Sequence, residues 1–165
     1  MNEKDIEIIN NLHYELEQNI DNGKGPFLAA IYDEGGNLLS KAQNSVIKDN
    51  CSMCHAEVNA IMQAQKELRT YDLSPYNATI YVTAEPCMMC LGAILWSGIK
   101  RICFSVSSET VEKITGFDEG YKPDWINQFK KRGIAVRPYV LSKAGERVLN
   151  LYMKKNGTIY SPNRD

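Results

Sequence analysis

The stretch "ATIYVTAEPCMMCLGAILWSG" at residues 78–98, with "RICFSV" at 101–106, decides the fold. The β-branched and aromatic residues of 78–85 predict a strand, and the apolar residues of 101–106 predict a second, buried strand. Between them, Pro86 and Gly98 stand at the two ends of an apolar segment, which is the usual arrangement for a helix. A strand, a helix and a strand in this order predict a right-handed crossover between two parallel strands.

The flanking segments extend this unit in both directions. We expect helices over 3–20, 55–71 and 142–157, a helical segment that begins at Ser107 or Ser108, an antiparallel hairpin with strands 27–33 and 38–44, and a strand over 133–140. Alternating helices and strands place the chain in the α/β class. The predicted architecture is a three-layer α/β/α sandwich with a mixed five-stranded sheet.

The length and composition are those of one globular domain. The chain has 165 residues, of which 44% are hydrophobic and 24% charged, so we expect a single domain over 1–165. The N-terminal segment lacks a basic region followed by an apolar one, and no run of eighteen apolar residues occurs. We therefore expect a cytoplasmic protein that does not enter a membrane.

The charge is unevenly distributed along the chain. Residues 1–121 carry nine basic and seventeen acidic side chains, whereas residues 122–165 carry ten basic and three acidic ones. A basic segment of this kind either binds nucleic acid or packs against an acidic body. We favour the second interpretation, so nucleic acid is not an expected partner.

The segment "CSMCHAE" at 51–57 has two conflicting interpretations. Its first five residues match the C-x-x-C-H pattern of covalent haem attachment, and its last three match an H-x-E metal motif. Both interpretations require His55, so the rest of the chain must decide between them. The count of five cysteines favours metal-binding or catalytic thiols over disulfide bonds.

A second cysteine pair supplies more metal ligands. Cys87 and Cys90 in "EPCMMC" are three residues apart at a predicted helix start, where the helix dipole stabilises thiolates. Two thiolates and the imidazole of His55 suit Zn²⁺, with a fourth position left for water. Glu57 is then placed to act as a base toward that water.

An alternative uses the first cysteine pair. Cys51 or Cys54 could complete a four-ligand zinc site, which would make the chain a non-catalytic structural zinc module.

The motifs "HAE" at 55–57 and "PCMMC" at 86–90 together resemble the cytidine/deoxycytidylate deaminase superfamily, whose signature is H-x-E…P-C-x-x-C. The resemblance implies one zinc ion held by His55, Cys87 and Cys90. It also implies hydrolytic deamination, in which Glu57 carries a proton from water to a ring nitrogen and then to the leaving amine. On this interpretation the haem pattern is accidental.

Within the superfamily, the segments "GPF" at 25–27, "QNS" at 43–45 and "GFDEG" at 116–120 resemble bacterial guanine deaminases. This resemblance implies conversion of guanine, or a related purine, to the deaminated product and ammonia. The substrate-binding residues that it implies are Phe27, Asn44, Ala56, Trp96, Glu119 and Tyr160. It further implies a homodimer in which the C-terminal helix and tail, 142–165, close the pocket of a neighbouring subunit.

Several alternatives stay open at this point. Phe27 and Trp96 also suit a hydrophobic core, Asn44 suits a turn, and Asp118 competes with Glu119 as the pocket acid. The basic C-terminal segment favours a tRNA adenosine deaminase, but Trp96 stands where that group tends to have histidine. A cytosine- or cytidine-type deaminase is a further alternative.

Overall fold

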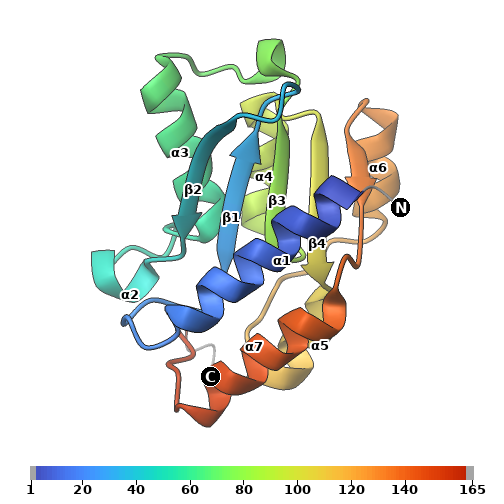
Figure 1. The fold of residues 1–165 in the computed structure, drawn as a ribbon. Coiled ribbons are helices and arrows are strands. Elements are labelled where there is room, and N and C mark those ends of the chain that lie inside the picture. Colours follow the sequence, from blue (N-terminus) through green and yellow to red (C-terminus); the bar gives the residue numbers. More distant parts are fainter. Residues whose placement is uncertain (1–2, 163–165) are drawn as a thin grey trace.

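The computed structural model describes residues 3–162 and contains one mixed sheet (Figure 1). Its strands are β1 (Leu28–Tyr32), β2 (Leu38–Gln43), β3 (Thr79–Ala84), β4 (Arg101–Val106) and β5 (Ala135–Arg137). They lie in the order β2-β1-β3-β4-β5. The β2-β1-β3 pairs are antiparallel and the β3-β4-β5 pairs are parallel, which confirms the predicted hairpin and crossover.

Helices cover both faces of the sheet. They are α1 (Glu3–Gln18), α2 (Val46–Asp49), α3 (Ala56–Leu68), α4 (Met88–Ser97), α5 (Ser108–Thr115), α6 (Trp125–Lys131) and α7 (Ser142–Lys154), with a short 3₁₀ helix η1 (Ser74–Tyr76). One hydrophobic core joins the sheet to α3, α4 and α6, and the other joins it to α1, α5 and α7. The predicted three-layer α/β/α sandwich is confirmed. Within residues 3–162, no helix is both long and apolar enough to cross a membrane.

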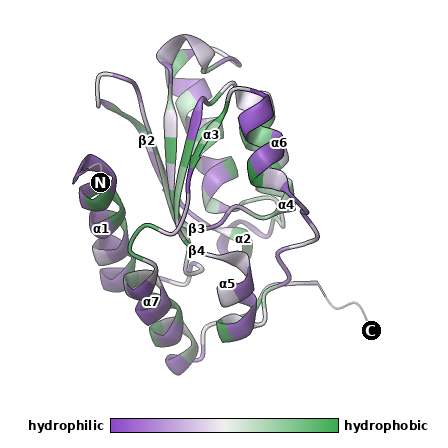
Figure 2. Ribbon diagram, turned by 90° about the vertical axis from the view of Figure 1, so that its right-hand side faces the viewer, coloured by the Kyte–Doolittle hydropathy of each residue, from purple (hydrophilic) through white to green (hydrophobic). Residues whose placement is uncertain are grey.

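The two cores follow from the alternation of side chains along each strand. In β1, Ala29 and Ile31 belong to the core on the α3 side, whereas Leu28 and Ala30 belong to the core on the α1 side. Figure 2 shows the sheet between its two helix layers. A strand that is buried on both faces reads as a continuous apolar run, which is why "FLAAIY" carries no polar residue.

Helix α6 and the ends of β5 and α7 differ from the sequence prediction. Helix α6 was not expected, because "WINQFKK" is mostly polar. It forms because Trp125 and Phe129, four residues apart, share one face and pack into the core beside Phe104. Strand β5 is shorter than the predicted 133–140, and α7 ends at Lys154. Residues 163–165 of the predicted tail lie outside the described residues.

Candidate active site

Two helix starts bring the predicted metal ligands together. His55 is the N-cap of α3 and Cys87 is the N-cap of α4, both with extended backbone, and Cys90 lies in the first turn of α4. Cys87 thus precedes the helical turn into which the sequence placed it. Both helices begin at the ligand group, so the positive ends of their dipoles favour anionic thiolates there.

The spacing of the donor atoms fits a zinc ion. His55 Nδ1 lies 3.5 Å from Cys87 Sγ and 3.6 Å from Cys90 Sγ, and all three donors lie within 4.8 Å of one another. Zinc bonds of about 2.3 Å to sulfur and about 2.0 Å to nitrogen, at tetrahedral angles, separate the ligand atoms by about 3.5 Å. The residues present can therefore hold a tetrahedral metal.

The protonation of Cys87 also suits a metal ligand. A hydrogen bond from the Cys90 thiol, and then one from His55, lowers the pKa of Cys87 to about 4, although burial opposes the shift. The thiolate is the form of cysteine that binds metal.

Neither cysteine of the "CSMCH" segment belongs to this group. Among the described residues, the cluster of possible metal ligands contains His55, Cys87 and Cys90, and neither Cys51 nor Cys54. Three protein ligands are the pattern of a catalytic zinc site, because a structural site is closed by four. The four-ligand alternative and the haem interpretation are therefore both wrong.

Glu57 stands beside the three ligands in the first turn of α3. Its side chain is 6% exposed, and desolvation, followed by the charge of Cys87, raises the pKa of Glu57 to about 7. A carboxyl group with a pKa near neutrality can both accept and return a proton. Glu57 therefore has the position and the protonation behaviour of a proton carrier.

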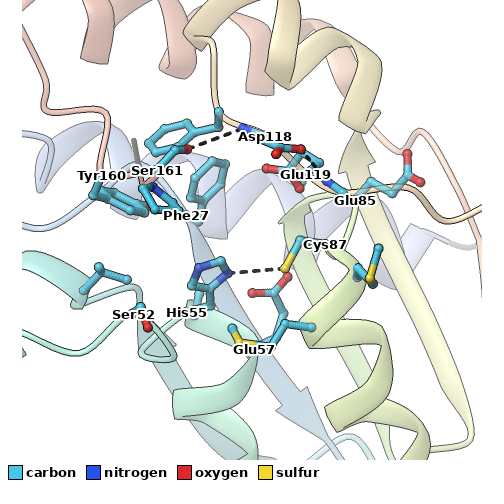
Figure 3. A pocket seen from close by; sticks show the side chains of 18 of the residues that line it. Phe27, Ser52, His55, Glu57, Glu85, Cys87, Asp118, Glu119, Tyr160 and Ser161 are labelled. Carbon is cyan, nitrogen blue, oxygen red and sulfur yellow. Dashed lines mark hydrogen bonds between the residues drawn. The ribbon is translucent and has the colours of Figure 1, made fainter. Parts of the chain in front are cut away.

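A cavity of about 590 Å³ opens over this group (Figure 3). Four of the six predicted substrate-binding residues line it: Phe27, Ala56, Glu119 and Tyr160. Phe117 also lines the cavity, where it packs edge-on against Phe27 and tilted against Tyr160. The result is an aromatic wall on one side and carboxylates on the other.

Glu119 is the better placed of the two candidate acids. Both Asp118 and Glu119 line the cavity, but Asp118 is exposed and Glu119 is half-buried. The backbone of Glu119 is held at both ends, since its carbonyl accepts from Met88 N at 3.2 Å and its N–H donates to Glu112 Oε1 at 3.1 Å. Desolvation, followed by the charge of Cys87, raises the pKa of Glu119 to about 8.

Asn44 lies behind the cavity wall, and it is not one of the residues that line the cavity. It is 1% exposed, its Oδ1 accepts from the backbone N–H of Phe27 at 3.1 Å, and its Nδ2 donates to the Tyr160 hydroxyl at 2.5 Å. The residue therefore joins the strand before the site to the C-terminal tail. Tyr160 reaches the pocket of its own chain, where its ring also approaches that of His55.

Trp96, a predicted substrate-binding residue, lies outside the cavity of its own chain. Its side chain is 87% exposed on α4, so it belongs neither to the cavity of its own chain nor to the core. The physical reason is helix periodicity, because Cys90 and Ile94 occupy the inward face of α4 and Trp96 falls on the opposite face.

A buried lysine that belongs to no sequence motif lies beside the site. Lys122 Nζ donates to the carbonyl of Pro86 and to Ser108 Oγ, both at 2.5 Å, and lies 3.3 Å from Glu85 Oε1. Glu85 also accepts from Trp125 Nε1 at 2.7 Å. A single lysine in an irregular loop is not part of any motif. The only sequence feature that could have indicated this contact is Glu85, which directly precedes "PCMMC".

Comparison with known proteins places this site in a family. The model of the MafB19-like deaminase family matches residues 3–129. A probable cytosine deaminase from Schizosaccharomyces pombe is 34% identical over 138 residues, which cover 84% of this chain and 82% of that protein. A tRNA-specific adenosine deaminase from Buchnera aphidicola is 33% identical over 134 residues, which cover 81% and 83%.

Solved structures agree with this assignment. Guanine deaminase from Nitrosomonas europaea is 36% identical, with a TM-score of 0.83 over 87% of this chain and 81% of that one. Its complex with 2,6-diaminopurine matches with a TM-score of 0.86 over 93% of this chain and 83% of that one. The chain therefore belongs to the MafB19-like deaminase family, in the cytidine deaminase-like superfamily, and is a hydrolytic deaminase.

Proposed function

We propose that this chain deaminates purine bases, with guanine converted to xanthine and ammonia as the preferred reaction. The observation that carries the proposal is a second carboxylate, Glu119, in the same cavity as Glu57. Guanine presents N–H donors at N1 and at its amino group, and carboxylate oxygens accept such donors. The solved purine complex of the Nitrosomonas enzyme supports a purine as the occupant of this cavity.

The proposed chemistry assigns a role to each group. His55, Cys87 and Cys90 would hold the zinc ion, which when bound would supply a nucleophile at neutral pH by lowering the pKa of a water molecule. Glu57 takes the proton that the attacking water loses and delivers it to the ring nitrogen beside the amino-bearing carbon. Glu57 then protonates the departing amine, so that ammonia leaves and an oxygen takes its place. The N–H donors of the bound ring favour the carboxylate form of Glu119, which lowers its pKa from about 8, and Glu119 then accepts these donors and orients the ring.

A substitution of Glu57 tests the chemistry. We expect Glu57→Gln to lower ammonia release by about 10²–10⁴-fold, the usual contribution of a positioned acid–base group. Glu67→Gln is the matched control, because Glu67 lies exposed on the same helix. Wild-type turnover in Glu57→Gln at unchanged zinc content would rule out the assigned role.

A substrate panel tests the choice of base. We expect ammonia from guanine, and slower or no release from guanosine, adenine, cytosine, cytidine and a tRNA anticodon stem-loop. The Buchnera relative supports tRNA adenosine as a second candidate, and the S. pombe relative supports cytosine. If only the RNA or only the pyrimidines react, the purine-base proposal is wrong although the deaminase assignment stands.

The metal is tested by its removal and return. We expect about one zinc ion per chain in the purified protein, loss of activity after chelation, and recovery when Zn²⁺ is restored. A Cys90→Ser variant should lose the metal, whereas Cys103→Ser should keep it, because Cys103 lies in the sheet core away from the ligand group. Full activity of protein shown to be free of metal would contradict the proposal.

The predicted homodimer and cytoplasmic location stay predictions. Exposed apolar side chains support an interface on the outer surface of α3 and α4, where Met62, Leu95 and Trp96 reach solvent. Such a concentration of apolar side chains on a helix layer is typical of a protein–protein contact. The molar mass in solution, compared between the wild type and Trp96→Glu, measures it.

A further inference from the structure

Two cysteines beside the active site take no part in the chemistry described so far. Cys51 and Cys54 are the first and last residues of a turn that is closed by a backbone hydrogen bond of 3.1 Å from Cys54 N to the Cys51 carbonyl. A turn of this kind keeps the two Cα atoms within about 7 Å. Disulfide bonds span Cα separations of about 4.4–6.8 Å, so the backbone of the turn is compatible with a bond between the two cysteines.

Both thiols can be reached by small molecules. Neither cysteine is in a disulfide bond, and both are only partly buried. Hydrogen bonding by the backbone N–H of Met53, and then by the neighbouring thiol, lowers the pKa of Cys51. Thiol–disulfide exchange begins with a thiolate, so the lowered pKa favours Cys51 as the attacking group.

The turn forms part of the catalytic pocket. Ser52 lines the cavity and lies beside His55 in Figure 3. The turn is tied to its surroundings by hydrogen bonds from Ser45 N to the Cys54 carbonyl at 2.8 Å and from Cys51 N to the Val46 carbonyl at 3.1 Å. A change in the conformation of this turn would therefore alter the wall of the pocket and move Cys54, which directly precedes the metal ligand His55.

We propose that Cys51 and Cys54 form a reversible disulfide bond by exchange with small-molecule disulfides such as oxidised glutathione. The Cys51 thiolate attacks one sulfur of the oxidant, which releases one glutathione thiolate and leaves a mixed disulfide. The Cys54 thiolate then attacks the Cys51 sulfur and releases the second glutathione. The two protein thiols lose two electrons and two protons, and one glutathione disulfide becomes two glutathione thiols.

Peptide mapping of the zinc-loaded, full-length protein tests the proposal. The protein is equilibrated in buffers with a rising ratio of oxidised to reduced glutathione, the free thiols are blocked, and the peptides are identified by mass. We expect a Cys51–Cys54 linkage that grows with this ratio and disappears on return to reduced glutathione, while Cys103 stays free. Linkages of Cys87 or Cys90 in its place, or free Cys51 and Cys54 in oxidised glutathione alone, would overturn the proposal.

Two single variants test the order of attack. Cys54→Ser should accumulate a stable glutathione adduct on Cys51, because no second thiol can release it. Cys51→Ser should take up much less glutathione at Cys54 under the same conditions. A wild-type protein that keeps glutathione on Cys51 without closing the ring would contradict the proposal. None of these readouts depends on which base the protein deaminates.

Discussion

At the scale of single residues, the site contains a lysine, Lys122, that belongs to no sequence motif. Lys122 is 9% exposed at its side chain and bridges two segments of the active site. It binds the carbonyl of Pro86, directly before Cys87, and it belongs to the same loop as Glu119. Its ammonium is compensated by the buried carboxylate of Glu85. Lys122 thus joins the segment that carries a metal ligand to the segment that carries the second carboxylate.

Removal of this cation should affect both stability and catalysis. We expect Lys122→Met to lower the free energy of unfolding by about 3 kcal/mol, because Glu85 is left buried without its partner. We also expect kcat/KM for the preferred base to fall by at least about tenfold, because displaced catalytic groups lose their alignment. Urea denaturation and steady-state kinetics measure the two effects.

The control for this variant is Lys130→Met, which alters an exposed lysine on α6. Unchanged kcat/KM in folded Lys122→Met would show that Lys122 stabilises the protein without positioning the site.

At the scale of elements, helix α1 is anchored to the sheet by a polar contact as well as by its apolar face. Asp5 is 1% exposed and accepts two hydrogen bonds from Arg101 of β4, at 2.8 and 2.6 Å. Tyr81 of β3 donates a third from its hydroxyl at 3.1 Å. The arrangement is a bidentate, charge-assisted contact, which holds a guanidinium in one orientation.

Loss of this anchor should loosen the layer of α1. We expect Asp5→Ala to lower the free energy of unfolding by about 3 kcal/mol, since Arg101 and Tyr81 lose their acceptor in a largely buried position. Glu7→Ala, on the exposed side of the same helix, should change it by less than about 0.5 kcal/mol. Chemical denaturation measures both, and equal losses in the two variants would contradict the anchoring role.

At the scale of the whole molecule, the layer of α1 and α7 encloses a histidine that folding keeps neutral. His13 of α1 is 4% exposed, and its Nε2 lies 2.8 Å from Ser105 Oγ of β4. Burial, and then the charge of Arg147 on α7, lowers the pKa of His13 to about 4. Its Nδ1 atom is buried without a hydrogen-bond partner among the described residues.

This histidine predicts the acid sensitivity of the fold. The unfolded chain binds a proton at His13 below a pH of about 6.5, whereas the folded chain resists it down to about 4. The contribution of neutral His13 to the free energy of unfolding is therefore complete above pH 6.5. As the pH falls toward 4, the free energy of unfolding decreases by up to about 3 kcal/mol. We expect His13→Gln to flatten the dependence of unfolding free energy on pH between 4 and 6.5. An unchanged slope would exclude His13 as its source.

The uneven charge along the chain has a partial structural explanation. Lys155 of the basic C-terminal segment pairs with Asp21, in the acidic N-terminal part of the chain. Burial opposes a lowered pKa of Asp5, but the hydrogen bonds and charge of Arg101 lower it, and the charge of Arg137 from the basic segment makes a smaller contribution in the same direction. These contacts agree with the interpretation that the basic segment packs against the acidic body.

The sequence by itself determined the chemistry of this protein, and the reason is local. His55 and Glu57 lie in one short motif at a helix start, and Cys87 and Cys90 lie in another, so spacing along the chain predicts the arrangement within each motif. The packing of α3 and α4 in one core brings the two motifs together. The sheet was predictable for a similar reason, because strand alternation and the helix between β3 and β4 are properties of contiguous segments.

Only the tertiary structure decided how the pocket is completed. Lys122 and Tyr160 reach the site from loops, where side-chain direction follows from packing and not from periodicity. The outward position of Trp96 and the inward position of Glu119 likewise depend on how α4 and its neighbouring loop settle on the sheet. Contacts between distant parts of a chain form because the folded chain buries their shared surface. The local periodicity of a sequence does not predict these contacts.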